Sequence, residues 1–326
     1  MMQPSDGRSE RATAGWPRIA VVGAGGVGCY FGGMLARGGA PVTFIARANH
    51  VAAMRARGLI IERVKAKDTV VVEASTDIEA ARGAELALLC AKTTNVVEAS
   101  RSLVPLLPAH ATVLCLQNGV DSADRVREAT GLDALPVVVY VAAEMVADGH
   151  VQMGGRGVLI TGDPDATADR SHVRPLAALA ALFAGAGVPL TLSANIRGDL
   201  WQKMVLNCTY NALSAIARVR YGAIHSNPSA AALVPGLIAE CVAVARALGV
   251  TMPDVDLYEA GRKLTQELAA AAYSSTAQDL LRGRRTEIDS LNGYIAREGA
   301  RRGIATPLNQ LLHALVKLQE DALAPG

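Results

Sequence analysis

The chain has 326 residues, of which 51% are of apolar types and 19% are charged. This composition excludes a disordered chain and, at about 150 residues per domain, predicts two domains, each with its own core. The net charge is +2, from 32 lysines and arginines against 30 acidic residues, which argues against a nucleic-acid-binding surface. The five cysteines form no CxxC pair, which favours a reducing compartment over a disulfide framework or a structural zinc site.

Residues 1–16 are polar and contain glycine and proline, so we expect a disordered lead-in. The segment lacks the apolar centre of a signal peptide. The longest apolar run expected, residues 176–190, is too short to cross a bilayer. We therefore expect a cytoplasmic protein with no membrane partner.

Residues 17–194 alternate short apolar runs with helical patterns, which predicts βαβ units and a parallel sheet. Strands are expected at 18–23, 41–46, 86–90 and 112–116, and helices at 27–37 and 96–107. After residue 135 the runs at 136–146, 150–153 and 157–161 are expected to extend this sheet in antiparallel fashion. A helix at 168–184 and a strand at 188–192 then close the domain.

From residue 195 onward no segment has the pattern of a strand. Helical periodicity marks the segments 197–218, 228–249, 255–272, 284–302 and 307–321. The sequence thus predicts an α/β fold, with a Rossmann-type sheet domain over residues 17–194 and an all-helical domain over residues 195–326. The apolar helices at 228–249 and 307–321 could pack either within their domain or across a homodimer.

A glycine-rich turn follows the first strand and opens the first helix; it consists of Gly23, Ala24, Gly25, Gly26, Val27 and Gly28. In a dinucleotide-binding fold the first glycine permits the tight turn, the second lets the backbone approach a pyrophosphate, and the third lets the helix pack on the strand. A GxGxxG alone is weak evidence and also occurs in ordinary turns. Its position between strand and helix predicts binding of a dinucleotide by the helix N-terminus.

The residue that ends the second strand is Arg47, where an NAD enzyme would place a carboxylate for the ribose hydroxyls. A carboxylate repels a 2′-phosphate, whereas a guanidinium binds it through two parallel hydrogen bonds. The sequence therefore predicts NADPH rather than NADH. The alternative is that Arg47 is only a solvated surface residue.

A narrow polar stripe runs along the first helix of the second domain. Lys203, Asn207 and Asn211 are spaced i, i+4, i+8 on a helix that is apolar nearly all round, and Ser214 lies close to the stripe. Buried polar groups are costly unless they are satisfied, so the stripe indicates a polar ligand. The alternative, a face that meets water, predicts a wider and more charged face.

Two strand ends add polar groups to the same predicted crevice. Lys92 ends one strand, and Gln117, Asn118 and Gly119 end the next, where the carboxyl ends of an open α/β sheet face the ligand. Either strand end can also be an ordinary loop. The basic residues at 282, 284 and 285 are expected to form a solvated helix start.

Together these residues resemble the ketopantoate reductase (2-dehydropantoate 2-reductase) family from residue 18 to about residue 320. The matching pieces are residues 23–28, Lys92 in AKT, QNG at 117–119, LWQKMVLNCTYN at 200–211, SS at 274–275 with QD at 278–279, and TEID at 286–289 with NG at 292–293. Several short motifs in the right order are far more specific than a GxGxxG alone. The resemblance implies an N-terminal Rossmann domain, a C-terminal helical domain and hydride transfer from NADPH to the ketone of a 2-oxo acid.

The resemblance also implies roles for single residues. Lys203 matches the catalytic lysine, and Asn118 and Glu287 match active-site positions that serve the reaction and lie near cofactor and substrate. On the substrate side, Asn207 and Asn211 match residues that bind the substrate's hydroxyl end, and Ser275 matches one that binds its carboxylate. On the cofactor side the matching positions are Lys92 and, more weakly, Ala143.

The chain departs from the family pattern at two places. Tyr221-Gly222 stands where the pattern has Asn-Gly, and residues 139–144 lack its Thr/His texture. Both departures concern the substrate rather than the cofactor. We therefore expect an NADPH-dependent reductase of 2-dehydropantoate in pantothenate biosynthesis, with Lys203 as general acid, and two alternatives remain: a reductase of another 2-oxo acid, or a non-catalytic NADP(H)-binding sensor.

Overall fold

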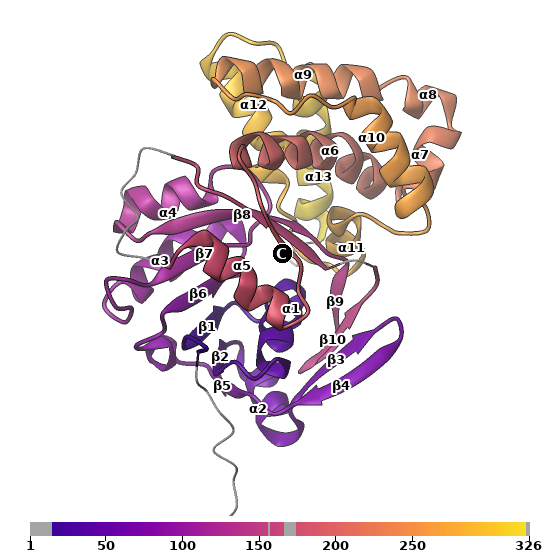
Figure 1. Ribbon diagram of the computed structural model, residues 1–326. Helices are drawn as coiled ribbons and strands as arrows, with labels where there is room; N and C mark the ends of the chain where they lie inside the picture. The colour runs from indigo at the N-terminus through magenta and orange to yellow at the C-terminus, as the bar shows by residue number, and fades with distance from the viewer. Residues whose placement is uncertain (1–14, 156, 166–173, 324–326) are drawn as a thin grey trace, which may run out of the picture.

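The computed structural model describes residues 15–155, 157–165 and 174–323. The chain begins with a sheet-containing half and ends with a helical half (Figure 1). This confirms the predicted fold class. The expected lead-in, residues 1–16, and the start of the helix expected at 168–184 lie almost entirely outside the described residues.

The main sheet has eight strands in the order β12-β11-β8-β7-β6-β1-β2-β5. Their bounds are β1 Ile19–Val22, β2 Val42–Ile45, β5 Glu73–Ser75, β6 Leu86–Leu89, β7 Thr112–Cys115, β8 Ala134–Tyr140, β11 Val158–Thr161 and β12 Leu190–Leu192. The six strands from β5 to β8 are mutually parallel, and β11 runs antiparallel to β8 with β12 parallel to β11. The expected parallel sheet is therefore present, and its antiparallel edge is shorter than expected.

A second sheet, of four strands in the order β4-β3-β10-β9, corrects the expectation for residues 143–153, which do not extend the main sheet. Its bounds are β3 Leu59–Arg63, β4 Ala66–Val70, β9 Ala143–Ala147 and β10 His150–Met153. β8 is a parallel strand of the main sheet, while β10 pairs with β3, and β9 pairs with β10 at the edge of the second sheet. The segment 59–75, for which the sequence analysis made no prediction, supplies the partners that make this sheet possible.

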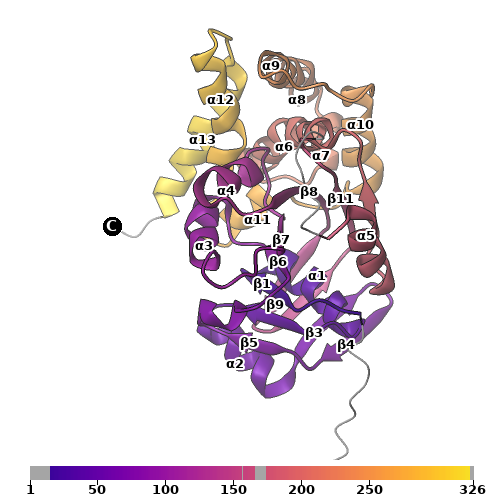
Figure 2. The same ribbon diagram turned by 60° about the vertical axis from the view of Figure 1, so that its left-hand side comes forward.

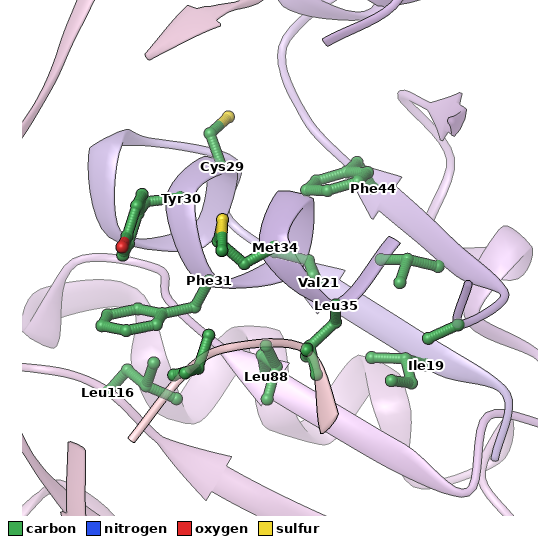
Figure 3. Close-up of a cluster of buried hydrophobic side chains, with 14 of the residues drawn as sticks. Ile19, Val21, Cys29, Tyr30, Phe31, Met34, Leu35, Phe44, Leu88 and Leu116 are labelled. Atoms are coloured by element: carbon green, nitrogen blue, oxygen red, sulfur yellow. The ribbon is translucent and has the colours of Figure 1, made fainter. Parts of the chain in front are cut away.

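Helix α1 (Gly26–Arg37) lies between the two sheets, and its side chains fill the core around β1 (Figure 3). Two adjacent glycines allow this close packing. A Cβ on Gly32 would lie 2.5 Å from a methyl of Val21, and one on Gly33 would lie 2.7 Å from the Cδ1 of Ile61 in the other sheet. Because protein interiors are close-packed, both positions require the smallest residue.

The other helices of this half cover the main sheet or join its strands (Figures 1 and 2). Their bounds are α2 Ala48–Arg57, α3 Val96–Leu103, α4 Ser122–Thr130 and α5 Leu176–Gly185, with short 3₁₀ turns at Ile78–Ala81 and Thr93–Asn95. A second apolar cluster, on the face opposite α1, packs α3 and α4 against β6 and β7. Helices therefore cover both faces of the main sheet.

The helical half begins with α6 (Ile196–Ala217), which Asn195 caps through its side chain. The helices that follow are α7 Gly222–Ser226, α8 Pro228–Ala231, α9 Val234–Ala247, α10 Leu257–Lys263, α11 Ser275–Leu281, α12 Asn292–Arg301 and α13 Pro307–Leu323. A π-helical turn spans Leu264–Leu268 and a 3₁₀ turn spans Ile288–Ser290. Compared with the expected segments, 228–249 is two helices, α12 starts later than residue 284, and α7 and α11 are additional.

One stretch, Pro228–Ala247, is long and apolar enough by length and composition to cross a membrane, although residues 176–190 were expected to be the longest apolar run. One such stretch among the described residues is weak evidence, because the core helix of a soluble protein passes the same test. Here Glu240 on α9 accepts hydrogen bonds from the backbone N–H groups of Leu308 and Asn309, at 2.9 Å each. These bonds join α9 to the first turn of α13.

Candidate active site

The glycine-rich turn has the geometry that a dinucleotide needs. Gly23 has φ of +96°, and a Cβ there would lie 2.5 Å from the backbone nitrogen of Ala91. Gly28 packs against the carbonyl of Gly23, where a Cβ would lie 2.5 Å away. By contrast, nothing lies within 4 Å of a Cβ built on Gly25, which is exposed. The space beside Gly25 is therefore open to a phosphate, as its predicted role requires.

The N-terminus of α1 is free to bind an anion. Its N-cap is Gly25, which has no side chain to occupy the first N–H groups, and the first turn contains no acidic residue. Gly26 lies against β9, since a Cβ there would be 2.4 Å from the carbonyl oxygen of Ala143. Ala143 thus adjoins the predicted cofactor turn. Of the other two residues of the turn, Ala24 is buried and Val27 packs against the core.

Arg47 lies one residue beyond Ala46, which follows the end of β2, and is the N-cap residue of α2. Its side chain is exposed. About one helical turn later, burial and the positive charges of Arg47 and Arg284 lower the pKa of His50, while the charge of Asp148 raises it. Arg47 therefore adds positive potential at the end of β2, where the 2′-phosphate of NADP is expected.

Lys203 on α6 reaches across to the sheet half of the molecule. Its ammonium group donates hydrogen bonds to Oδ1 of Asn118, at 3.0 Å, and to the carbonyl of Val139 on β8, at 2.7 Å. A lysine ammonium has three protons, so one remains for a ligand. The ring centroid of Tyr140, which ends β8, lies 5.9 Å from the same nitrogen.

Asn118 and Lys203 belong to a chain of hydrogen bonds that also includes Glu287. The amide of Asn118 donates to Oε2 of Glu287 at 3.0 Å, and the hydroxyl of Thr93 donates to Oε1 at 2.8 Å. The Thr93 backbone N–H donates to the same Oε1 at 3.2 Å. Glu287 comes from the helical half, so the two halves build this cluster together.

Burial lowers the pKa of Lys203 to about 8, and the negative charge of Glu287 opposes that shift. Desolvation disfavours the charged form of an amine, whereas a nearby carboxylate favours it. Desolvation is the larger of the two effects. An amine with a pKa near 8 is well matched to giving up a proton near neutral pH.

Lys92 was expected to end a strand, but β6 ends at Leu89 and Lys92 precedes the 3₁₀ turn Thr93–Asn95. Its contacts link it to the helical half. Its ammonium donates to the carbonyl of Arg285 at 2.6 Å and lies 3.6 Å from a carboxylate oxygen of Asp279. Nearby, Arg282 forms an ion pair with Glu144 on β9. The basic segment 282–285 is exposed, as expected, but it does not start a helix: it follows the end of α11 and contacts Lys92 and, on β9, Glu144.

The predicted substrate residues differ in their accessibility. Asn207 is half-buried, and its side chain has no hydrogen bond to another described residue; Ser275 is exposed at the first position of α11. Asn211 is only 3% exposed and accepts a hydrogen bond from the Tyr221 hydroxyl at 2.7 Å. The structure thus brings Lys203, Asn118 and Glu287 into one cluster, with Asn207 one helical turn from Lys203.

Two contributors to the cluster were not predicted. Thr93 is fully buried and binds Glu287, and the carbonyl of Val139 accepts from Lys203. Thr93 is the last residue of the AKT motif at 91–93, which contributed to the family resemblance. The motif could have pointed to Thr93, but nothing in the sequence indicated that it binds Glu287. A backbone carbonyl leaves no signal in the sequence. Among the residues that the structure describes, no group of three histidines, cysteines or acidic residues is arranged to hold a metal ion.

Comparison with known proteins agrees with this architecture over nearly the whole chain. The family model "Ketopantoate reductase PanE/ApbA" matches residues 19–166, and "Ketopantoate reductase PanE/ApbA C terminal" matches residues 195–320. The 2-dehydropantoate 2-reductase of Pyrococcus horikoshii is 31% identical over 306 residues, which cover 93% of this chain and 98% of the relative.

Solved structures show the same similarity. A PanE/ApbA family ketopantoate reductase from Ralstonia eutropha is 47% identical, with a TM-score of 0.87 over 94% of this chain and 99% of the other. D-mandelate dehydrogenase, solved with NADH and anilino(oxo)acetate, is 25% identical, with a TM-score of 0.86 over 94% and 99% of the two chains. The chain belongs to the ketopantoate reductase family and is an oxidoreductase of that family.

Proposed function

We propose that this protein reduces the ketone of a 2-oxo acid with NADPH, and that Lys203 is the general acid. Its relatives named 2-dehydropantoate 2-reductase make 2-dehydropantoate the first substrate to test. The observation that carries the proposal is the partly satisfied ammonium of Lys203, held by Asn118 and Val139. We also propose that the domain boundary lies at residues 194–195. The domain before it would bind the cofactor, and the domain after it would make most of the substrate contacts.

NADPH would supply a hydride to the carbonyl carbon. The residues present fit such a cofactor, because the turn is open beside Gly25 and the N-terminus of α1 is uncapped by any side chain. We assign the pyrophosphate to residues 23–28, the 2′-phosphate to Arg47, and further cofactor contacts to Lys92, Ala143, Asn118 and Glu287.

Charge develops on the carbonyl oxygen as the hydride arrives, so the site needs a donor aimed at that oxygen. The remaining N–H of Lys203 meets this need and can then pass its proton to the oxygen. Asn118 holds the ammonium in place through its carbonyl oxygen, while Glu287 fixes the orientation of the Asn118 amide. Asn207 and Ser275 are left to bind the rest of the substrate.

The test is NADPH oxidation with 2-dehydropantoate as substrate, for the native protein and for Lys203→Ala. Loss of the acid should lower kcat by about 10²–10⁴-fold while NADPH still binds. Lys263→Ala, which changes an exposed lysine on α10, is the control and should keep full activity. Near-normal kcat in Lys203→Ala would refute the acid role.

Two alternatives keep the fold. D-mandelate dehydrogenase, with anilino(oxo)acetate, shares this architecture, so another 2-oxo acid is the second candidate substrate. A protein that senses NADP(H) without turnover is the third possibility, and a general acid would serve no purpose in it. Tight NADPH binding without turnover of any 2-oxo acid would favour the sensor.

A further inference from the structure

The polar stripe of α6, formed by Lys203, Asn207 and Asn211, is accessible at the Lys203 end and buried at the Asn211 end. We call these its open end and its closed end. Lys203 and Asn207 are half-buried, whereas Asn211, one turn further on, is only 3% exposed. The three residues lie on one face of the helix, rising about 6 Å per step. A substrate that binds at Lys203 and extends along the stripe therefore meets a closed wall at Asn211.

Tyr221 and Ser274 form this closure. The Tyr221 hydroxyl donates to Oδ1 of Asn211 at 2.7 Å, and the Ser274 hydroxyl donates to the Asn211 backbone carbonyl at 2.9 Å. Burial raises the pKa of Tyr221, so it remains a neutral donor at ordinary pH. Its backbone N–H is held by the carbonyl of Ala272 at 2.9 Å. The hydrogen bond to Asn211 is thus built into the fold.

The surroundings of Tyr221 are apolar. Its ring packs against a buried cluster that includes Leu206, Ile224 and Val234. At the other end of the stripe, the ring of Tyr140 is 37% exposed beside the Lys203 ammonium. An aromatic ring therefore lies at each end of the stripe. At the closed end, Tyr221 and Asn211 are already hydrogen-bonded to each other.

We infer that Tyr221 determines substrate selectivity by occupying Asn211, so that the distal end of the crevice takes a 2-oxo acid with an apolar or aromatic terminus in preference to one with a terminal hydroxyl. This inference rests on the proposed 2-oxo acid reduction and narrows its substrate class. A hydroxyl that reaches the closed end meets an Asn211 side chain that is only 3% exposed and whose Oδ1 already accepts a hydrogen bond from Tyr221. Leaving a buried hydroxyl without a partner lowers affinity.

Asn207 moderates the effect, because its amide remains open one turn nearer to Lys203. We therefore expect a preference of about tenfold, at the low end of the cost of an unpaired buried polar group. The exclusion is partial, so 2-dehydropantoate is still turned over, though less efficiently than its deoxy analogue.

The experiment compares kcat/KM with NADPH for a matched pair of substrates. One is 2-dehydropantoate, and the other is 3,3-dimethyl-2-oxobutanoate, which has the same carbon skeleton without the hydroxyl. Phenylglyoxylate tests the aromatic terminus. We expect the native protein to favour the deoxy substrate by about tenfold and to accept phenylglyoxylate.

Two variants assign that preference to Tyr221. Tyr221→Asn replaces the ring by a short amide and should shift the ratio towards 2-dehydropantoate by about tenfold or more. Tyr221→Phe keeps the ring and frees Oδ1 of Asn211, so it should give a smaller shift in the same direction, and it serves if the Asn variant folds poorly. The control is Tyr294→Phe, a half-buried tyrosine of α12 stacked edge-on against Trp201, which should leave the ratio unchanged.

A native preference for 2-dehydropantoate over the deoxy acid, or an unchanged ratio in both Tyr221 variants, overturns the inference while the proposed reductase function stands. Absence of turnover with all three 2-oxo acids overturns the proposed function and the inference with it. A shift of the ratio through KM rather than kcat supports binding selectivity at the distal end, and a shift confined to kcat contradicts it.

Discussion

The ionisation of Lys203 should control the pH dependence of the reaction. Its pKa is lowered to about 8, and the protonated form is the one that can donate to the ketone. The kcat for ketone reduction should therefore fall as the pH rises through about 8. A pH–rate profile at saturating NADPH and substrate measures this decline.

Glu287→Gln should move that decline to lower pH. The carboxylate of Glu287 raises the pKa of Lys203 against the larger effect of burial, so removing its charge lowers that pKa further. Glu79→Gln, which changes an exposed acid that is paired with Arg82 and has no contact with the cluster, is the control. A decline that stays in place or moves to higher pH in Glu287→Gln would show that another group titrates.

Arg47→Ala tests the preference for a phosphorylated dinucleotide. The guanidinium follows β2 and is exposed, so its removal should leave the fold intact. It should lower the NADPH-over-NADH ratio in kcat/KM by about tenfold or more, because a charged hydrogen-bonded pair to the phosphate is lost. An unchanged ratio would mean that Arg47 is only a surface residue.

At the scale of elements, the glycine turn offers a matched pair of substitutions. Gly25→Ala adds a methyl group where nothing lies within 4 Å, so the melting temperature should stay nearly unchanged. The KM for NADPH should nevertheless rise about tenfold or more, because the pyrophosphate has to approach this backbone. Gly23→Ala should instead lower the melting temperature by several degrees, because φ is +96° and Ala91 leaves no room.

Calorimetry measures the melting temperature of each variant, and kinetics measure its KM for NADPH. Together they distinguish a glycine that the cofactor requires from one that the fold requires. If Gly25→Ala binds NADPH normally, the turn does not approach a pyrophosphate at that residue. If both variants lose stability equally, the turn is a structural element alone.

The pairing of strands shows what local pattern can and cannot predict. The parallel order of β1, β2, β6 and β7 follows from strand–helix alternation, which is a local property. The pairing of β10 with β3 does not, because these two strands lie more than 80 residues apart in the chain and their sequences share only the alternation of a strand. The residues of β9 and β10 were therefore assigned to the wrong sheet, whereas the run at 157–161 does extend the main sheet in antiparallel fashion, as expected.

At the scale of the whole molecule, the halves meet at the strand ends through Lys92, Thr93 and Asn118. Lys92→Ala removes the hydrogen bond to the carbonyl of Arg285 and the ion pair with Asp279. The side chains of Lys92 and Asp279 are 50% and 25% exposed. Exposed pairs contribute about 0–1 kcal/mol, so the melting temperature should change by only a few degrees. The KM for NADPH should rise severalfold, because Lys92, a proposed cofactor contact, no longer joins the sheet half to the helical half beside the cofactor.

Lys67→Ala is the matched control, because Lys67 forms a comparable exposed ion pair with Glu62 in the second sheet. It should change neither the KM for NADPH nor kcat. Equal effects of the two variants on the KM would show that Lys92 has no special place at the cofactor. The homodimer considered from the sequence stays a prediction; on α13, Leu311 and Leu318 are 54% and 65% exposed.

The sequence by itself determined the glycine turn, the i, i+4, i+8 stripe of α6 and the change from strands to helices near residue 195, because each depends on spacing within a few turns of chain. Only the tertiary structure decided that Glu287 holds Asn118 beside Lys203, that Thr93 joins them, and that Tyr221 covers Asn211. Those contacts, apart from the last, join residues more than 80 positions apart. Burial, which sets the pKa of Lys203, likewise exists only once the two halves have packed together.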